Sequence, residues 1–162
     1  MGMQIRDVRS SDIEAVRLLN ESVVPQVNSV NTERMLWFAE NADYFRVAEN
    51  GGGIAGMLIG FRPGEAYSSP YYRWFCERFD DFAYIDRVAI AAAARRQGLA
   101  SAMYRDFESH FRQQVPRLAC EVNLLPPNDT SLEFHRRMGF VRVENAVIEP
   151  GLREVTRLVK EF

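Results

Sequence analysis

Cysteine, histidine and lysine are scarce in this sequence of 162 residues, which has two, two and one of them respectively. Cys76 and Cys120 are too few for a disulfide framework and have apolar or aromatic neighbours, so we expect two buried free thiols. His110 and His135 are far apart and lack the spacing of zinc ligands. We therefore expect no metal site. The single lysine is Lys160, so almost every basic side chain is an arginine.

Long apolar runs are also absent, since no stretch approaches the roughly eighteen residues that a membrane-spanning helix needs. The first residues contain no apolar signal-peptide core. We therefore expect a cytoplasmic protein without membrane contact. The formal net charge of −2 lacks the basic excess that is typical of nucleic-acid-binding domains, so no nucleic acid is expected. Residues 95–142 carry eight basic and five acidic side chains, an excess that suits a small polyanionic ligand.

The composition, 47% apolar and 26% charged, is that of a globular domain with a real core. No repeat or linker divides the chain, so residues 1–162 are expected to form one α/β domain with a mixed sheet. Ser11 and Glu14 have the spacing of a helix capping box. Strands are predicted at 3–8, 45–48, 54–61, 82–90, 118–124, 140–147 and 154–159, and helices at 11–20, 31–40, 99–114 and 129–138. The helix at 99–114 has one apolar stripe, which we expect to pack against the sheet: Leu99, Met103, Phe107 and Phe111.

The segment 88–101 has the pattern of a ligand-binding turn. An apolar strand ends at Ile90, a short loop carries Arg95 and Arg96, and a helix opens after Gly98. Unpaired amides and the positive end of the helix dipole make such a helix start a phosphate site. The alternative is an ordinary strand-to-helix turn with two solvated arginines. The segment is neither a P-loop nor a dinucleotide fingerprint.

Two motifs in this order carry a family resemblance. Arg95-x-x-Gly98-x-Ala100 resembles the coenzyme A pyrophosphate loop of the GNAT superfamily of N-acetyltransferases. Asn128-x-x-Ser131-x-x-Phe134-His135-x-x-x-Gly139-Phe140 resembles that family's second signature. A predicted strand lies between the two motifs, as in the family, and the resemblance covers the chain except for residues 63–81.

The resemblance implies a twisted mixed sheet of about seven strands and about four helices, splayed between the fourth and fifth strands to hold acetyl-CoA. It implies that the fourth strand pairs with the pantetheine arm and that the helix start holds the pyrophosphate. Asn128 would hydrogen-bond to the pantetheine or to a nearby carbonyl, and an ordinary helix N-cap is the compatible alternative. The implied cofactor residues are Val88, Ala89, Ile90, Arg95, Arg96, Gln97, Gly98, Leu99, Ala100, Ser101 and Asn128.

Acetyl transfer to an amine needs a neutral amine, a donor for the carbonyl oxygen and a proton for the leaving thiolate. Glu121 is a carboxylate in an otherwise apolar strand, and its position resembles that of the general base in several family members. The alternative is a solvent-facing or sheet-edge Glu. Asp86 and Tyr84, which share a face of the fourth strand, are rival candidates for the base.

His135 stands where many family members have a tyrosine that protonates the thiolate. An imidazole can donate that proton near neutral pH. The alternatives are a packing role for His135 and catalysis by proximity, without a dedicated acid.

Residues 63–81 exceed the hairpin that is usual for the family at this place, and we interpret them as an irregular, aromatic-rich insertion with one helical turn around 72–79. It could cover the acceptor site, with Tyr71, Tyr72 and Trp74 as contacts. Glu65, Glu77 or Asp86 would then attract a cationic amine. The alternatives are that the insertion packs on the sheet, which we favour for its phenylalanines, or contacts a second copy in a homodimer.

The sequence therefore predicts an acetyl-CoA-dependent N-acetyltransferase that uses a primary amine of a small molecule or peptide terminus. A non-catalytic acyl-CoA sensor and a ligand-free interaction domain are the alternatives, and an intact phosphate loop argues against the second.

Overall fold

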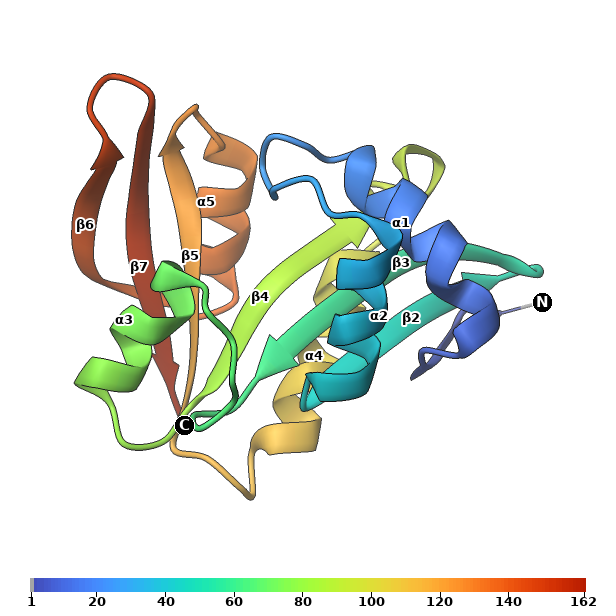
Figure 1. Cartoon of the computed structure of the whole chain (residues 1–162), viewed down its shortest axis with the longest axis horizontal. Helices are drawn as coiled ribbons and strands as arrows, with labels where there is room; N and C mark the ends of the chain where they lie inside the picture. Colours follow the sequence, from blue (N-terminus) through green and yellow to red (C-terminus); the bar gives the residue numbers. More distant parts are fainter. Residues whose placement is uncertain (1) are drawn as a thin grey trace.

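Seven strands form one mixed sheet in the order β1-β2-β3-β4-β5-β7-β6 in the computed structural model, which describes residues 2–162 (Figure 1). The strands are β1 (Gln4–Asp7), β2 (Tyr44–Asn50), β3 (Gly53–Phe61), β4 (Ala83–Ile90), β5 (Arg117–Leu125), β6 (Val141–Glu149) and β7 (Arg153–Glu161). The helices are α1 (Ile13–Glu21), α2 (Thr32–Asn41), α3 (Pro70–Arg78), α4 (Leu99–Phe111) and α5 (Asp129–Arg137), with 3₁₀ turns at Ser10–Asp12 and Ala92–Ala94. The predicted α/β class and mixed sheet are confirmed.

The sheet opens between β4 and β5, its one parallel neighbour pair. Only Ala83 with Leu118 and Tyr84 with Ala119 are in register there, and beyond these pairs the two strands diverge (Figure 1). From Ile85 to Ile90, the edge of β4 that faces β5 has no ladder partner. The splay that the family resemblance implies is therefore confirmed, and it leaves main-chain groups of β4 free to bind something other than a strand.

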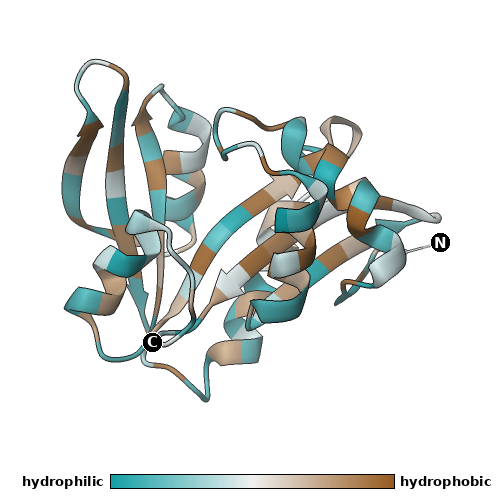
Figure 2. Cartoon of the chain, viewed as in Figure 1, coloured by the Kyte–Doolittle hydropathy of each residue, from teal (hydrophilic) through white to brown (hydrophobic). Residues whose placement is uncertain are grey.

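Helices cover both faces of the sheet, with α1, α2 and α3 on one face and α4 and α5 on the other. Hydrophobic residues follow the strands and the inner sides of the helices (Figure 2). The α4 stripe is buried as predicted, at Leu99, Met103, Phe107 and Phe111. It packs closely on β3, because a Cβ atom added at Gly60 would clash with the Phe107 ring.

A polar contact also joins α4 to β7. The ammonium of Lys160 donates a 2.8 Å hydrogen bond to the Glu108 carboxylate. Both side chains are mostly buried, so little of this ion pair is exposed to solvent. No helix among residues 2–162 has the length and apolar character needed to cross a membrane.

The start of α1 differs from the prediction. Ser11 and Glu14 form no capping box, since the Asp12 carboxylate accepts from the Arg9 amide at 2.7 Å and Glu14 pairs with Arg17. Arg6 donates to the same Asp12 carboxylate and holds its pKa below the usual range. A strong ion pair to β1 thus outcompetes the local serine cap.

The segment 63–81 also differs, because it contains the nine-residue helix α3 where one turn was expected. Ser69 caps the helix by accepting from the Tyr72 amide, and Pro70 occupies the first turn, where its missing N–H costs nothing. Within the helix, the side chains of Tyr72 and Phe75 are buried, and burial was expected for the phenylalanine. The helix count is therefore five in the described chain instead of about four.

A β-bulge in β4 shapes the site described below. Gly60 of β3 pairs with Ile85 and the preceding residue, Ile59, pairs with Arg87, so Asp86 is the extra residue. The bulge breaks the alternation of side chains. As a result, Asp86 and Arg87 both contact the elements that cover the α1 face.

Candidate active site

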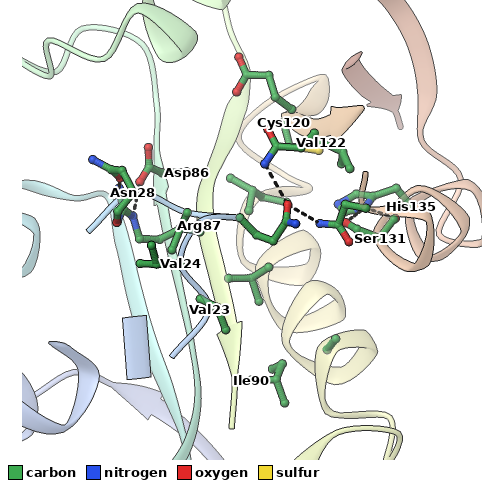
Figure 3. Close-up of a pocket in the computed structure, with 18 of the residues that line it drawn as sticks. Val23, Val24, Asn28, Asp86, Arg87, Ile90, Cys120, Val122, Ser131 and His135 are labelled. Atoms are coloured by element: carbon green, nitrogen blue, oxygen red, sulfur yellow. Dashed lines mark hydrogen bonds and ion pairs between the residues drawn. The ribbon is translucent and has the colours of Figure 1, made fainter. Parts of the chain in front are cut away.

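The splay continues into a cleft of about 1570 Å³, larger than a typical small-ligand pocket. Its walls are the free edge of β4 with the start of α4, the strand β5 with α5, the α1–α2 connection (residues 22–31), and residues 67–71. Figure 3 shows Asp86 and Arg87 on one side of it and Ser131 and His135 on the other.

The turn into α4 has the backbone of an anion site. Arg96 has a φ of 62° and Gly98 a φ of 78°, so two of three successive residues are left-handed. This conformation is unfavourable for Arg96 and is typical of functional turns. Because Gly98 has no side chain, nothing caps the first amides of α4, and a Cβ there would have no neighbour within 4 Å.

The predicted cofactor residues fall into two groups. Gln97 turns back to donate to the Ala93 carbonyl, and Ala89 is buried in the core, so neither side chain lines the cleft. The other predicted residues of this segment do line it: Val88, Ile90, Arg95, Arg96, Gly98, Leu99, Ala100 and Ser101.

Asn128 is the residue before α5 and lines the cleft, but it makes no side-chain cap. Its amide instead donates to Gln26 Oε1 at 3.2 Å, and Asn123 of β5 donates to the same oxygen at 2.9 Å. The α1–α2 connection therefore reaches across the gap to β5 and α5, beside which it lies in Figure 1. Asn28 fastens the other side of the connection to Arg87.

Glu121 lies on β5 two residues beyond the last β4–β5 pair, at the narrow end of the cleft. Tyr84 donates to its Oε1 at 2.5 Å, whereas its Oε2 is buried without a hydrogen bond. Burial raises the pKa of Glu121 to about 8, against the opposing effects of Tyr84 and Arg157. The structure thus brings together Glu121 and Tyr84, and places a carboxyl group of basic pKa in the cleft.

Asp86 faces the same end of the cleft from β4, and its charge contributes to the raised pKa of Glu121. Its own oxygens are occupied, because Tyr67 donates to one at 2.6 Å and Arg87 to the other at 2.7 Å. The side chains of Asp86 and Arg87 are about 5% exposed. The negative charge of this carboxylate is therefore already balanced by Arg87 inside the protein.

His135 lies on the other face, where α5 meets α4. Its Nδ1 is 2.7 Å from the Ser131 carbonyl, which can only accept, so Nδ1 carries the hydrogen. Nε2 then accepts from the Tyr104 hydroxyl at 2.8 Å. Burial lowers the pKa of His135, so the imidazole is neutral and both its nitrogens are satisfied.

The three aromatic residues predicted to contact the acceptor are dispersed. Tyr71 lines the cleft. Tyr72 is 1% exposed and donates to the Arg62 carbonyl within the core. Trp74 stacks against Arg157 and Arg78 outside the cleft.

Sequence reasoning missed three residues that organise the site: Gln26, Arg87 and Tyr104. Arg87 carried a signal, since a charge inside an apolar strand marks a buried polar contact, as it did for Glu121. Tyr104 is a polar aromatic on the buried side of α4. Gln26 carried no signal, because it is one polar residue in a loop. Within residues 2–162 no group of three or more His, Cys, Asp or Glu side chains is arranged to hold a metal ion.

Comparison with known proteins agrees with this arrangement. The sequence model of the acetyltransferase (GNAT) family matches residues 13–140, most of the chain. Among solved structures, smu.2055 from Streptococcus mutans UA159 superposes with a TM-score of 0.80 at 17% identity, with 98% of each chain covered. Ard1 from Thermoplasma volcanium has a TM-score of 0.79 at 20% identity and covers 99% of this chain and 98% of its own.

Arabidopsis thaliana NAA60, solved with a bisubstrate analogue, has a TM-score of 0.77 at 16% identity and covers 99% of this chain and 98% of its own. At these identities the structures establish the fold. A search of curated proteins gave no significant match.

Proposed function

The chain belongs to the acetyltransferase (GNAT) family, and from that premise we propose that it transfers the acetyl group of acetyl-CoA directly to a primary amine in a ternary complex. The acceptor is a small molecule or a peptide terminus. The observation that carries this proposal is the shared cleft: the unpaired edge of β4, the uncapped start of α4 and the buried carboxyl of Glu121 all line it.

The residues present fit the cofactor. The left-handed turn at Arg96 and Gly98 precedes the uncapped start of α4 at the wall of the cleft, and Arg95 and Arg96 add positive charge there. The free edge of β4, from Ile85 to Ile90, would pair with the amides of the pantetheine arm. Asn128 would hydrogen-bond to the same arm after its contact with Gln26 opens. Bound acetyl-CoA would supply an acetyl group activated as a thioester.

Glu121 is proposed as the general base. Its pKa of about 8 lies near that of an α-amine, so proton transfer between the two is nearly balanced. The unpartnered Oε2 is the atom that would accept the proton of the amine, directly or through water. Transfer would then form the bond between the amine nitrogen and the acetyl carbon and break the carbon–sulfur bond. The proton lost by that nitrogen would end on the thiolate, which would leave as the free thiol. Asp86 remains the rival base, but it would first have to leave Arg87 or Tyr67.

The role of His135 as proton donor to the thiolate stays a prediction, and it requires that one hydrogen bond of the imidazole opens. Both ring nitrogens are engaged inside the protein, so donation requires that the hydrogen bond to Ser131 or to Tyr104 opens. With those bonds intact, His135 instead holds α5 against α4 across the splay.

The test is a screen of primary amines with acetyl-CoA that monitors free thiol release, with binding of acetyl-CoA measured separately by calorimetry. We expect binding, and release of thiol that depends on the added amine. Binding without release by any amine would favour the acyl-CoA sensor, and absence of binding would contradict both functions.

A further inference from the structure

Arg34 lines the cleft from the first turn of α2. Its guanidinium lies over three aromatic rings, 4.5 Å from the centroid of Trp37, 5.2 Å from that of Phe38 and 5.3 Å from that of Tyr67. No carboxylate of residues 2–162 forms an ion pair with it. Arg87, on the same side of the cleft, is instead committed to Asp86.

This environment holds the guanidinium without using its donors. None of the hydrogen bonds among residues 2–162 uses the guanidinium N–H groups of Arg34, and a guanidinium held over aromatic rings can still bind a carboxylate in a bidentate manner. The aromatic contacts restrict the long side chain, so less entropy is lost when an anion binds. Tyr67 is itself fixed, by its hydrogen bond to Asp86 and by stacking on Phe61 at 4.5 Å.

The charges around Arg34 favour an anion. Asp86, which could have attracted a cationic amine, is neutralised by Arg87 and Tyr67. Glu121, with its pKa of about 8, is mostly protonated at pH 7. An acceptor with several positive charges would therefore meet no free carboxylate there, and its second cation would be repelled by Arg34.

We propose that Arg34 binds a carboxylate on the acceptor, so that the substrate is a primary amine that also carries a carboxylate. The proposal rests on the proposed acetyl transfer and names the substrate class of the same site. Tyr67 sets the spacing, because its ring contacts Arg34 and its hydroxyl contacts Asp86 at the narrow end of the cleft. The amine and the carboxylate would therefore lie a few bonds apart in one small molecule.

The experiment compares ω-amino acids of increasing chain length, from glycine to aminohexanoate, with alkylamines and diamines of matched length. Calorimetry on the protein saturated with coenzyme A measures binding, and thiol release from acetyl-CoA measures transfer. We expect one chain length at which the amino acid binds at least about 10-fold more tightly than its alkylamine, as a charge-assisted contact provides. Diamines should bind most weakly.

Arg34→Glu should lower the affinity for that amino acid by about 10- to 100-fold and raise that for the matched diamine. Arg34→Gln, which removes the charge without reversing it, should abolish the preference, and it keeps the test informative if the charge reversal destabilises the protein. Arg105→Glu, at an exposed position of α4, is the matched control and should change neither affinity.

Equal affinities of amino acid and alkylamine at every length, or a preference that survives in Arg34→Gln, would overturn the inference. Because binding is read without transfer, the two proposals can fail separately. A carboxylate preference lost in the variants without thiol release would support the role of Arg34 and contradict acetyl transfer. Thiol release without such a preference would do the reverse.

Discussion

Glu121 combines a buried carboxyl oxygen that has no hydrogen bond with a position at the narrow end of the splay. Its raised pKa of about 8 means that only about one molecule in ten carries the ionised base at pH 7. The chain therefore holds a base that is weakly populated at neutral pH but well matched to an amine. Activity should increase with pH as this carboxyl ionises.

Glu121→Gln keeps the shape of the side chain and removes the base. We expect kcat/KM of the parent to rise with pH up to about 8, and turnover of the variant near pH 7 to fall by about 10²- to 10⁴-fold. The measurement is a pH–rate series with one active amine, with Glu133→Gln on the exposed side of α5 as control. Overlapping profiles for parent and Glu121→Gln would exclude Glu121 as the base, and a large loss in Asp86→Asn instead would assign it to β4.

The same residue affects stability with a defined sign. The pKa of Glu121 is higher in the folded than in the unfolded chain, so the folded state retains its proton while the unfolded state loses it. The free energy of unfolding should therefore decrease as pH rises from about 4.5 to about 8, and Glu121→Gln should remove that decrease. This loss of stability at higher pH is consistent with a functional position, where a buried carboxyl is retained for its chemistry.

At the scale of an element, the start of α4 can be tested by filling it. Gly98→Glu adds a negative charge and a Cβ atom at a φ of 78°, so the stabilisation by acetyl-CoA in thermal unfolding should be lost. Gly151→Glu is a close control for backbone strain, because Gly151 has a φ of 75° and a Cβ atom there would also have no neighbour within 4 Å. Unlike Gly98, Gly151 lies outside the cleft. If Gly98→Glu retains the parent's stabilisation by acetyl-CoA, the phosphate site lies elsewhere.

Elements with strong local patterns were predictable from the sequence, and those that depend on tertiary contacts were not. The α4 stripe follows from the spacing of Leu99, Met103 and Phe107, and all three are buried. The helix α3 was underestimated although Ser69 and Pro70 form a recognisable start. The cap of α1 could not be foreseen, because Asp12 is taken by Arg6 of another strand.

The same division holds for the site. Glu121 and the turn at Gly98 stand out as a charge in an apolar strand and a glycine before a helix. The contacts of Gln26 depend on how the α1–α2 connection crosses the gap, which no local pattern specifies. The aromatic setting of Arg34 likewise joins α2 to the distant Tyr67.

At the scale of the whole molecule, only two ladder pairs give main-chain pairing between β4 and β5 in the described sheet. A ligand that lies along β4 and contacts α5 should therefore join the two halves. We expect acetyl-CoA to raise the melting temperature. At a concentration of 100 times Kd, it should raise the free energy of unfolding by about 2.7 kcal/mol. Hydrogen exchange should slow in residues 85–90 as well as in 95–101, with β6 as an internal control on the far edge. Protection confined to 95–101 would contradict binding along β4.

The ion pair between Lys160 and Glu108 has a consequence for self-modification. Thioesters acetylate neutral amines without any enzyme, and a protein that keeps acetyl-CoA at its surface exposes its own side chains to that reaction. Here the one lysine of the chain is paired with the Glu108 carboxylate, and apart from two histidines the other basic side chains of the proposed enzyme are arginines. Guanidinium groups remain charged and are poor nucleophiles. No lysine amine is therefore left free to consume the acetyl group intended for the substrate.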